Sequence, residues 1–354
     1  MLVHYKIVTI IFLPNINALD YAQTMVYYHI KGVRTVCNNT SINFEQIAKD
    51  CGLYDKDVSI VINNIEALEK KYTKEDLVYI YNYMLTFCKN PDIIMYLISC
   101  VDKYRSPSSL SVLVDLLLLK NLQVDDENNK EKYIKVRALC AKAIGNQKNT
   151  EYVSTLLYCL NNKHENYRVR LACADALGRI GDRFAVAPLI NVVEDEDEKS
   201  VYLRESAATA LGMLGDSRAI EPLVSILETK KGIIDKFSFL KERAIESLNK
   251  VGIGSNDRAF KALKKSLSDE SVQVRIDAIE ALMNSEHPSA YEAIKSVLIL
   301  DSDEEVKKNA LIALYNLSGR EILDEVINSP NYSDKLKICA VEIIDEYEED
   351  GEDK

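Results

Sequence analysis

The sequence predicts an all-α protein, folded as a right-handed superhelix of stacked helical pairs (an α-solenoid) that begins with an N-terminal helical cap. The first observation is internal repetition, because residues 169–189 nearly recur at 203–223 with a constant offset of 34 residues. Self-similarity at such a period is typical of stacked repeats. The second is that only 12 glycines and 7 prolines occur in 354 residues, which suits long helices and short connections. The third is a content of 47% hydrophobic and 28% charged residues, as in folded chains.

Composition and helical patterning divide the chain into six segments. These are an N-terminal extension (1–35), a helical region with a helix-turn-helix-like hairpin (36–90), a degenerate leading repeat (91–130), a regular repeat array (131–328), a C-terminal capping helix (329–345) and an acidic tail (346–354). Within the extension, the apolar run at 7–13 is too short to span a bilayer, so we expect no membrane segment. Met25 is an alternative start, and the sequence leaves open whether residues 1–24 belong to the expressed protein.

Residues 44–68 resemble a helix-turn-helix, with a short first helix, a turn at Gly52 and an apolar-spaced second helix. A DNA reader needs cations on its second helix to hold phosphates. Residues 41–71 instead carry four lysines against six carboxylates, with no arginine. The pattern therefore favours a helical hairpin that caps the solenoid. A transcription-associated regulator that uses this hairpin is the alternative.

The regular array repeats a basic residue near the start of each first helix. The basic positions are Arg137, Arg170, Arg204, Lys241, Arg275 and Lys307, and the residues six positions before them are Glu131, His164, Glu198, Asp235, Asp269 and Asp301. Each carboxylate falls in a turn, where it can accept backbone N–H groups, and each cation can bridge carboxylates of its own and a neighbouring repeat. We expect a structural ladder of exposed ion pairs that sets the register of the repeats. Each exposed pair would contribute only about 0.2–1 kcal/mol, so apolar stacking would carry the stability.

Small residues and turn residues recur in each repeat as well. The motif Ala-x-x-Ala-Leu follows the cation and lets neighbouring helices approach closely. We expect Gly178, Gly212 and Gly252 to end the first helices. An insert at 229–239 lengthens one repeat to 37 residues, and it is expected to expose Phe237 and Phe239 as candidate partner-binding residues.

Catalytic and metal-binding patterns do not emerge from the sequence. None of the eight cysteines lies in a Cys-x-x-Cys pair, and the four histidines form no repeated pair. The acidic run at 194–198 lacks the glycine and spaced ligands of a calcium loop. A net charge of −11 disfavours nucleic-acid binding. We therefore expect no cofactor, no metal and no membrane partner, and reduced cysteines in a cytoplasmic protein.

Residues 164–190 and 198–224 closely resemble HEAT-like repeats of the phycobilin-lyase type. The consensus of those repeats resembles Asp-x-x-x-x-Val-Arg-x-x-Ala-x-x-Ala-Leu-Gly-x-x-Gly-Asp-x-x-Ala-x-x-Pro-Leu. The match is weaker at 131–145 and 269–294 and loose at 235–252 and 301–317. The resemblance implies two helices in each repeat, with the second helices lining a concave face that binds partners. It specifies a fold rather than a function.

The resemblance favours a non-catalytic scaffold that binds another protein, since a solenoid offers an extended concave surface. One alternative that it implies is a bilin lyase-like or other accessory enzyme acting on a cofactor-bearing protein. Deoxyhypusine hydroxylase shares the repeat and places His-Glu just after the repeat arginine. This chain has Leu171-Ala172, Glu205-Ser206 and Ile276-Asp277 at those places, so the sequence disfavours a di-iron site.

Overall fold

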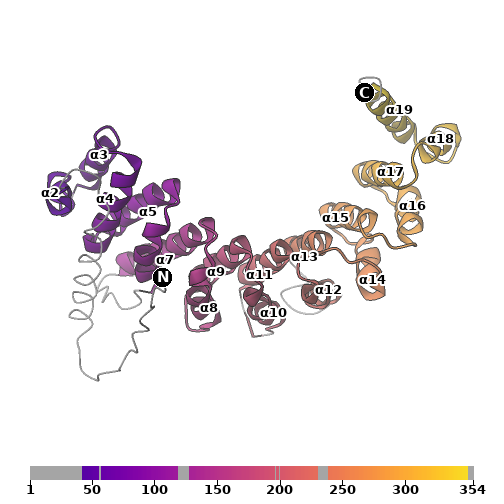
Figure 1. The fold of residues 1–354 in the computed structure, drawn as a ribbon. Coiled ribbons are helices and arrows are strands. Elements are labelled where there is room, and N and C mark those ends of the chain that lie inside the picture. The colour runs from indigo at the N-terminus through magenta and orange to yellow at the C-terminus, as the bar shows by residue number, and fades with distance from the viewer. Residues whose placement is uncertain are drawn as a thin grey trace, which may run out of the picture.

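The computed structural model describes residues 42–55, 57–118, 127–195, 197–198, 200–229 and 238–349. Within these ranges the regular elements are α-helices and short 3-10 helices, arranged as a curved two-layer stack (Figure 1). The predicted N-terminal extension lies outside the described residues, as do Asp235 and Phe237. The predicted all-α solenoid is therefore confirmed.

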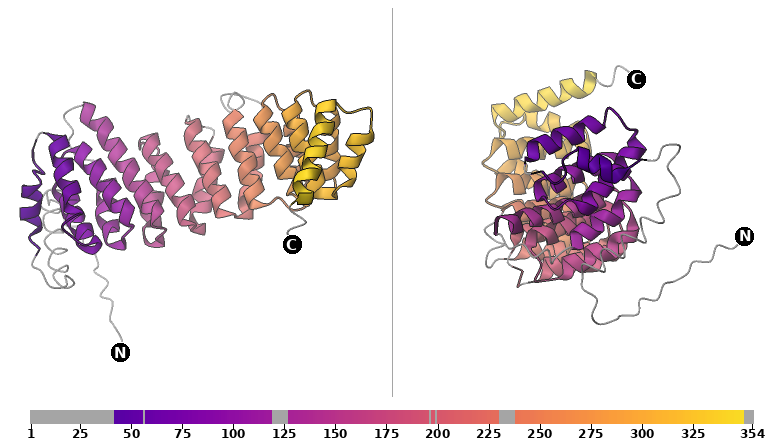
Figure 2. Two further views of the ribbon diagram at one scale, coloured as in Figure 1. Left: turned by 90° about the horizontal axis from the view of Figure 1, so that it is seen from above. Right: turned by 90° about the vertical axis from the view of Figure 1, so that its left-hand side faces the viewer.

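One layer, which we call the inner layer, consists of helices that each pack against the next inner helix along the chain. It comprises α3 (Val58–Leu68), α5 (Pro91–Tyr104), α7 (Glu127–Asn146), α9 (Tyr167–Ile180), α11 (Val201–Leu214), α13 (Ser238–Val251), α15 (Val272–Met283), α17 (Glu304–Ser318) and α19 (Asp334–Glu349). Seen from above, these helices lie side by side along the molecule (Figure 2). The first helix of every predicted repeat belongs to this layer.

The other layer, the outer layer, alternates with the inner one along the chain. It comprises α2 (Phe44–Asp50), α4 (Lys74–Phe87), α6 (Leu110–Leu118), α8 (Val153–Asn161), α10 (Val186–Glu194), α12 (Ile220–Glu228), α14 (Asp257–Ser266), α16 (Ala290–Leu300) and α18 (Glu321–Asn328). Four outer helices follow single 3-10 turns, namely η2 (Pro107–Ser109), η3 (Thr150–Tyr152), η4 (Arg183–Ala185) and η5 (Ser217–Ala219). A continuous apolar core of buried side chains fills the space between the layers.

Both ends of the described part of the chain continue this alternation. The helix-turn-helix-like hairpin consists of α2 in the outer layer and α3 in the inner layer, joined at Gly52 with a φ of 70°. Helix α3 packs on α5 as α5 packs on α7, so the predicted cap is itself the start of the stack. At the other end, α19 runs to Glu349, past the predicted boundary at 345.

The helix α9 shows how the sequence defines one inner helix. Asn166 caps its first turn, where the side chain accepts the backbone N–H of Arg168. Apolar side chains three and four residues apart, such as Val169 and Cys173, are buried against the outer layer and the neighbouring inner helices. The helix ends at Gly181, whose φ of 82° favours glycine.

The glycines expected to end the first helices have a different role at two positions. Gly178 lies inside α9, where an added Cβ would stand 2.8 Å from the Cα of Ala210 on α11. Gly212 lies inside α11, where an added Cβ would stand 2.9 Å from the Cα of Ser247 on α13. The prediction was wrong for both, because these glycines permit close contact between helices. Gly252 does follow the end of α13, with a φ of 77°.

The close contacts explain the direction in which the stack curves. Inner helices from α7 to α13 meet through glycines that contact alanine or serine, and the inner helices contact one another more extensively than the outer helices do. A stack with one layer drawn together bends toward that layer. The inner helices accordingly line the concave side of the arc, and the outer helices form its convex side (Figure 1). The expectation that the second helices line the concave face was wrong.

Two further observations concern the described residues alone. Seven cysteines lie within them, all buried and none in a disulfide. No described helix has both the length and the apolar character needed to cross a membrane.

Candidate functional site

Buried ion pairs connect successive repeats along the turns between outer and inner helices. At four of the six ladder positions, the cation near the start of an inner helix bonds a carboxylate in the corresponding turn of the next repeat. The pairs are Arg137 with Glu165, Arg170 with Glu198, Lys241 with Asp269 and Arg275 with Asp301, at N–O distances of 2.6, 2.5, 2.9 and 2.8 Å. These contacts tie the turn of one repeat to the first helix of the repeat before it.

At the start of the array, two carboxylates form other pairs than the sequence led us to expect. Glu165 occupies the acidic position in the turn before α9, rather than its neighbour His164. Glu131 does not pair with Arg137 and instead bonds the exposed guanidinium of Arg168 on the next inner helix. The acidic side of the ladder is thus shifted by one residue in this repeat.

Among the described residues, two further cations bond other groups than the expected carboxylates. The guanidinium of Arg204 donates to the backbone carbonyl of Val193 at 2.8 Å and to that of Asp195. Both carbonyls lie at the end of α10, where a cation is favourable because of the helix dipole. Lys307, near the C-terminal end of the stack, lies 3.6 Å from Glu304 of its own helix.

The ladder is buried, whereas the sequence led us to expect exposed pairs. Arg137, Arg170 and Arg204 are only 8, 6 and 6% exposed. Arg170 also donates through Nε to the Leu160 carbonyl at the end of α8, at 2.8 Å. Its partner Glu198 accepts the backbone N–H of Ser200 at 2.9 Å. Both side chains of this pair thus also bond the backbone of the turn or helix beside them, which gives the ladder a structural role.

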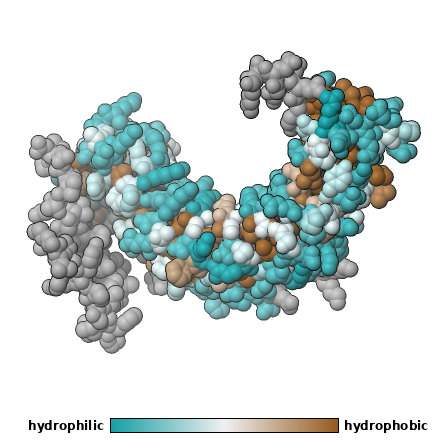
Figure 3. Space-filling view, turned by 45° about the vertical axis from the view of Figure 1, so that its right-hand side comes forward, coloured by the Kyte–Doolittle hydropathy of each residue, from teal (hydrophilic) through white to brown (hydrophobic). Residues whose placement is uncertain are grey.

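The exposed side of the inner helices forms the hollow of the arc (Figure 3). In α9 this side carries Leu171, Ala172 and Asp175, each half-buried, while the remaining sides of the helix pack on its neighbours. Across α9, α11, α13 and α15, the equivalent positions hold six carboxylates and one cation, Arg243, a net charge of −5. We call the carboxylates the acidic band: Asp175, Glu205, Glu242, Glu246, Asp277 and Glu280.

Burial perturbs the carboxyl groups of this band. It raises the pKa of Asp175, Glu205 and Asp277 above the usual range for such groups. The neighbouring carboxylate of Glu242 raises the pKa values of Glu205 and Asp277 further. In contrast, the hydrogen bond from Lys250 lowers the pKa of Glu246. Negative charge is thus held close together on the concave face.

The sequence alone did not single out the acidic band. Its signal lies in the residues that follow each ladder cation, where Glu205 and Glu242 come directly after Arg204 and Lys241. Those positions vary among repeats, so a search for repeated residues passes over them.

An aromatic pair borders the acidic band. The ring of Tyr202 on α11 stacks on that of Phe239 on α13, with centroids 5.7 Å apart and planes 11° apart. Tyr202 is 58% exposed, whereas Phe239 is half-buried against the core rather than fully exposed. Of the two phenylalanines predicted to bind a partner, Phe239 therefore lies within a surface aromatic pair, and Phe237 lies outside the described residues.

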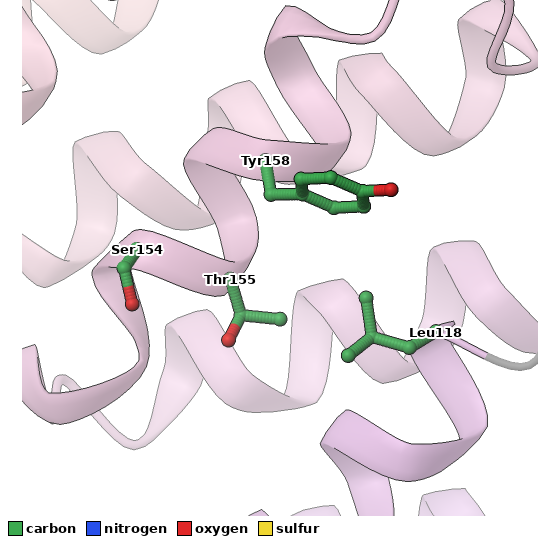
Figure 4. Close-up of a pocket in the computed structure, with 4 residues that line it drawn as sticks. All are labelled: Leu118, Ser154, Thr155 and Tyr158. Carbon is green, nitrogen blue, oxygen red and sulfur yellow. The ribbon is translucent and has the colours of Figure 1, made fainter. Parts of the chain in front are cut away.

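Two open hollows lie elsewhere on the surface. One, of about 430 Å³, is lined by Leu118 at the end of α6 and by Ser154, Thr155 and Tyr158 on α8 (Figure 4). Figure 4 shows Leu118 across the gap from the three side chains of α8. A second hollow, of about 570 Å³, lies between the α2–α3 turn, the start of α5 and α7. Among the described residues, no group of three or more His, Cys, Asp or Glu side chains is placed to hold a metal ion.

Comparison with known proteins identifies the repeat. The HEAT repeat family matches three overlapping stretches, 129–203, 162–236 and 233–315, which together span more than half of the chain. A comparison with curated proteins found no significant match.

Similar solved structures share low sequence identity with the chain. The complex of CpcE and CpcF of phycocyanin lyase from Nostoc sp. PCC7120 is 21% identical, with a TM-score of 0.41, over 67% of this chain and 87% of that one. The archaeal HEAT-like repeats protein from Thermococcus onnurineus NA1 is 17% identical, with a TM-score of 0.40, over 68 and 97%. Human deoxyhypusine hydroxylase is 16% identical, with a TM-score of 0.31, over 77 and 96%. From the repeat matches, the chain belongs to the HEAT repeat family.

Proposed function

We propose that the protein is a non-catalytic scaffold that binds another protein in the concave hollow of its solenoid. The observation that carries this proposal is the hollow itself, whose walls are the exposed sides of successive inner helices (Figure 3). Such a surface extends over many repeats and suits an extended contact with a protein better than the enclosure of a small molecule. The ladder cations Arg170 and Lys241 bond carboxylates of the ladder, whereas the carboxylates of the band lie on the concave side of the same layer.

We place this activity in the cytoplasm. The seven described cysteines carry no disulfide and lie in the apolar core, which suits a reducing compartment. Burial raises the pKa of the Cys140 thiol, so this group remains protonated and unreactive at neutral pH.

Site-specific photo-crosslinking in the native cell tests the use of the hollow. We would place benzoylphenylalanine at Thr209, which lies on the exposed side of α11 between Asp175 and Glu246, its counterparts on α9 and α13. The matched control position is the exposed Asn191 on the outer helix α10. We expect a defined protein adduct from Thr209 and none from Asn191. The proposal is wrong if Asn191 yields the adduct and Thr209 does not, or if both positions yield the same adducts.

A further inference from the structure

We propose that the acidic band binds an extended basic segment of the partner, with lysine or arginine at about every third residue. This inference rests on the proposed function, because it specifies the chemistry of the protein that enters the hollow. The occupant follows from three features of the inner helices: the lack of compensating charge, the spacing of the helices and the aromatic pair beside the band.

Among the described residues, the charge on the band is only partly neutralised. Arg243 and Lys250 both bond Glu246, and the positive charge of Arg179 partly offsets the effect of burial on Asp175. Arg243 approaches Glu205 only to 3.9 Å. In the part of the chain that the structure describes, no lysine or arginine forms an ion pair with Glu242. A partner that brings cations would supply the missing charge.

Like-charged neighbours make the ionised form of these carboxyl groups unfavourable in the free protein. Asp277 is half-buried, and the carboxylates of Glu242 and Glu280 oppose its ionisation. Glu205 is opposed in the same way by Asp175 and Glu242. A cation held between two such helices would relieve this repulsion, so complementarity of charge favours a basic partner over an acidic or apolar one.

The spacing of the helices sets the spacing of cations in the partner. Packed helices lie about 8–10 Å apart, and a chain in the polyproline II conformation advances about 3.1 Å per residue with three residues per turn. A segment in this conformation that crosses the inner helices therefore passes one helix about every three residues, and every third side chain faces the same way. From α9 to α15 it crosses three such intervals, about 27 Å, which takes about nine residues. An arginine at every third residue would then meet a band carboxylate on each helix in turn.

The aromatic pair adds a second kind of contact for the same segment. The exposed Tyr202 lies three residues before Glu205, which is close to one helical turn. Both side chains are therefore on the same side of α11. Its stacking on Phe239 fixes the ring at the surface. A guanidinium group can stack on such a ring while it bonds the neighbouring carboxylate, which favours arginine over lysine at this position.

Fluorescence anisotropy of the full chain with a labelled peptide tests the inference. The probe is a peptide of about twelve residues with arginine at every third position, separated by serine and glycine. The variant is Glu205→Gln/Glu242→Gln/Asp277→Asn, which removes three band charges without shortening a side chain. The matched control is Glu194→Gln/Glu292→Gln/Glu321→Gln, which removes three exposed charges from outer helices. Both variants have the same net charge, so a general electrostatic effect would weaken the probe equally.

We expect the band variant to weaken binding about tenfold and the outer control to change it less than about twofold. Tyr202→Ala should weaken the arginine peptide more than a peptide with lysine in its place. Equal weakening by the two triple variants, or no binding of the probe to the parent chain, would overturn the inference. Because the substitutions remove repulsion between carboxylates, the band variant should unfold at the same temperature as the parent chain or higher, and circular dichroism checks this.

Crosslinking separates a failure of this inference from a failure of the proposed function. If Thr209 crosslinks to a partner through a segment without basic residues, the hollow binds proteins but the assigned chemistry is wrong. If the crosslinked segment carries lysine or arginine at the proposed interval, both statements hold.

Discussion

The buried pair of Arg170 and Glu198 gives the sharpest test of what holds the repeats in register. Arg170→Met keeps most of the side-chain volume but removes the guanidinium, and it leaves the Glu198 carboxylate unpaired with its side chain only 10% exposed. Removal of one partner of a buried pair costs about 3–5 kcal/mol, whereas an exposed pair contributes about 0.2–1 kcal/mol. The Leu160 carbonyl also loses its hydrogen bond from Nε.

Urea unfolding followed by circular dichroism at 222 nm measures the loss. With an m value of about 3 kcal/mol/M, a loss of about 3–5 kcal/mol lowers the midpoint by about 1–2 M. The double variant Arg170→Met/Glu198→Gln should recover part of this loss, because it removes the stranded charge and keeps an acceptor for Ser200. Arg168→Met is the control, since both side chains of the pair of Arg168 with Glu131 are about half exposed, and it should leave the midpoint nearly unchanged.

If Arg170→Met lowers the free energy of unfolding by less than about 1 kcal/mol, the reasoning is refuted, because exposed ion pairs contribute that little. It would mean that water reaches Glu198 as soon as the guanidinium is removed. A repeat array need not unfold in one step. Loss of the Arg170–Glu198 pair can therefore also divide the unfolding transition into two steps, in which the repeats on either side of the α9–α11 contact unfold separately.

Three further predictions concern single positions on the inner helices. Gly178→Ala should destabilise by about 1–3 kcal/mol in thermal unfolding, because the new methyl group meets the backbone of Ala210, and an unchanged midpoint would contradict the close contact. Gly215→Ala should cost about 1–2 kcal/mol, since φ is 62° there, and Gly215→Asn should cost less if the left-handed backbone is the cause. Asp277→Asn should raise the melting temperature at pH 7. Burial raises the folded-state pKa of Asp277, so the parent chain is penalised at neutral pH and regains this stability as the pH falls toward about 4. An advantage of the Asn variant that persists at pH 3 would contradict this.

The sequence predicted the stacked helices well, because each repeat carries its own local signals. Capping residues such as Asn166 and Ser200 act within one helix, and so does the closing residue Gly181, although the sequence led us to place the end of that helix at Gly178. The direction of curvature could not be read in this way. It depends on how closely Gly178 approaches Ala210, a contact between residues on different helices.

The ladder shows the limit of reasoning from a period. In a 34-residue repeat, the position six residues before Arg170 and the position 28 residues after it are equivalent, so the spacing cannot say which repeat supplies the partner. The structure places the partner downstream, at Glu198. The burial of this pair could not be predicted from the sequence either, because both side chains are charged and charged residues are mostly exposed.

The ladder and the acidic band occupy neighbouring residues but face opposite ways, which explains why the hollow is negative. Arg204 turns into the fold and bonds carbonyls at the end of α10, while Glu205 lies on the concave side. Lys241 is likewise engaged with Asp269, while Glu242 follows it on the band. On our proposal, the repeats use their regular cations for register and leave carboxylates for recognition. The residues that we expect to govern stability and those that we propose to govern binding are therefore adjacent in sequence but separable by mutation.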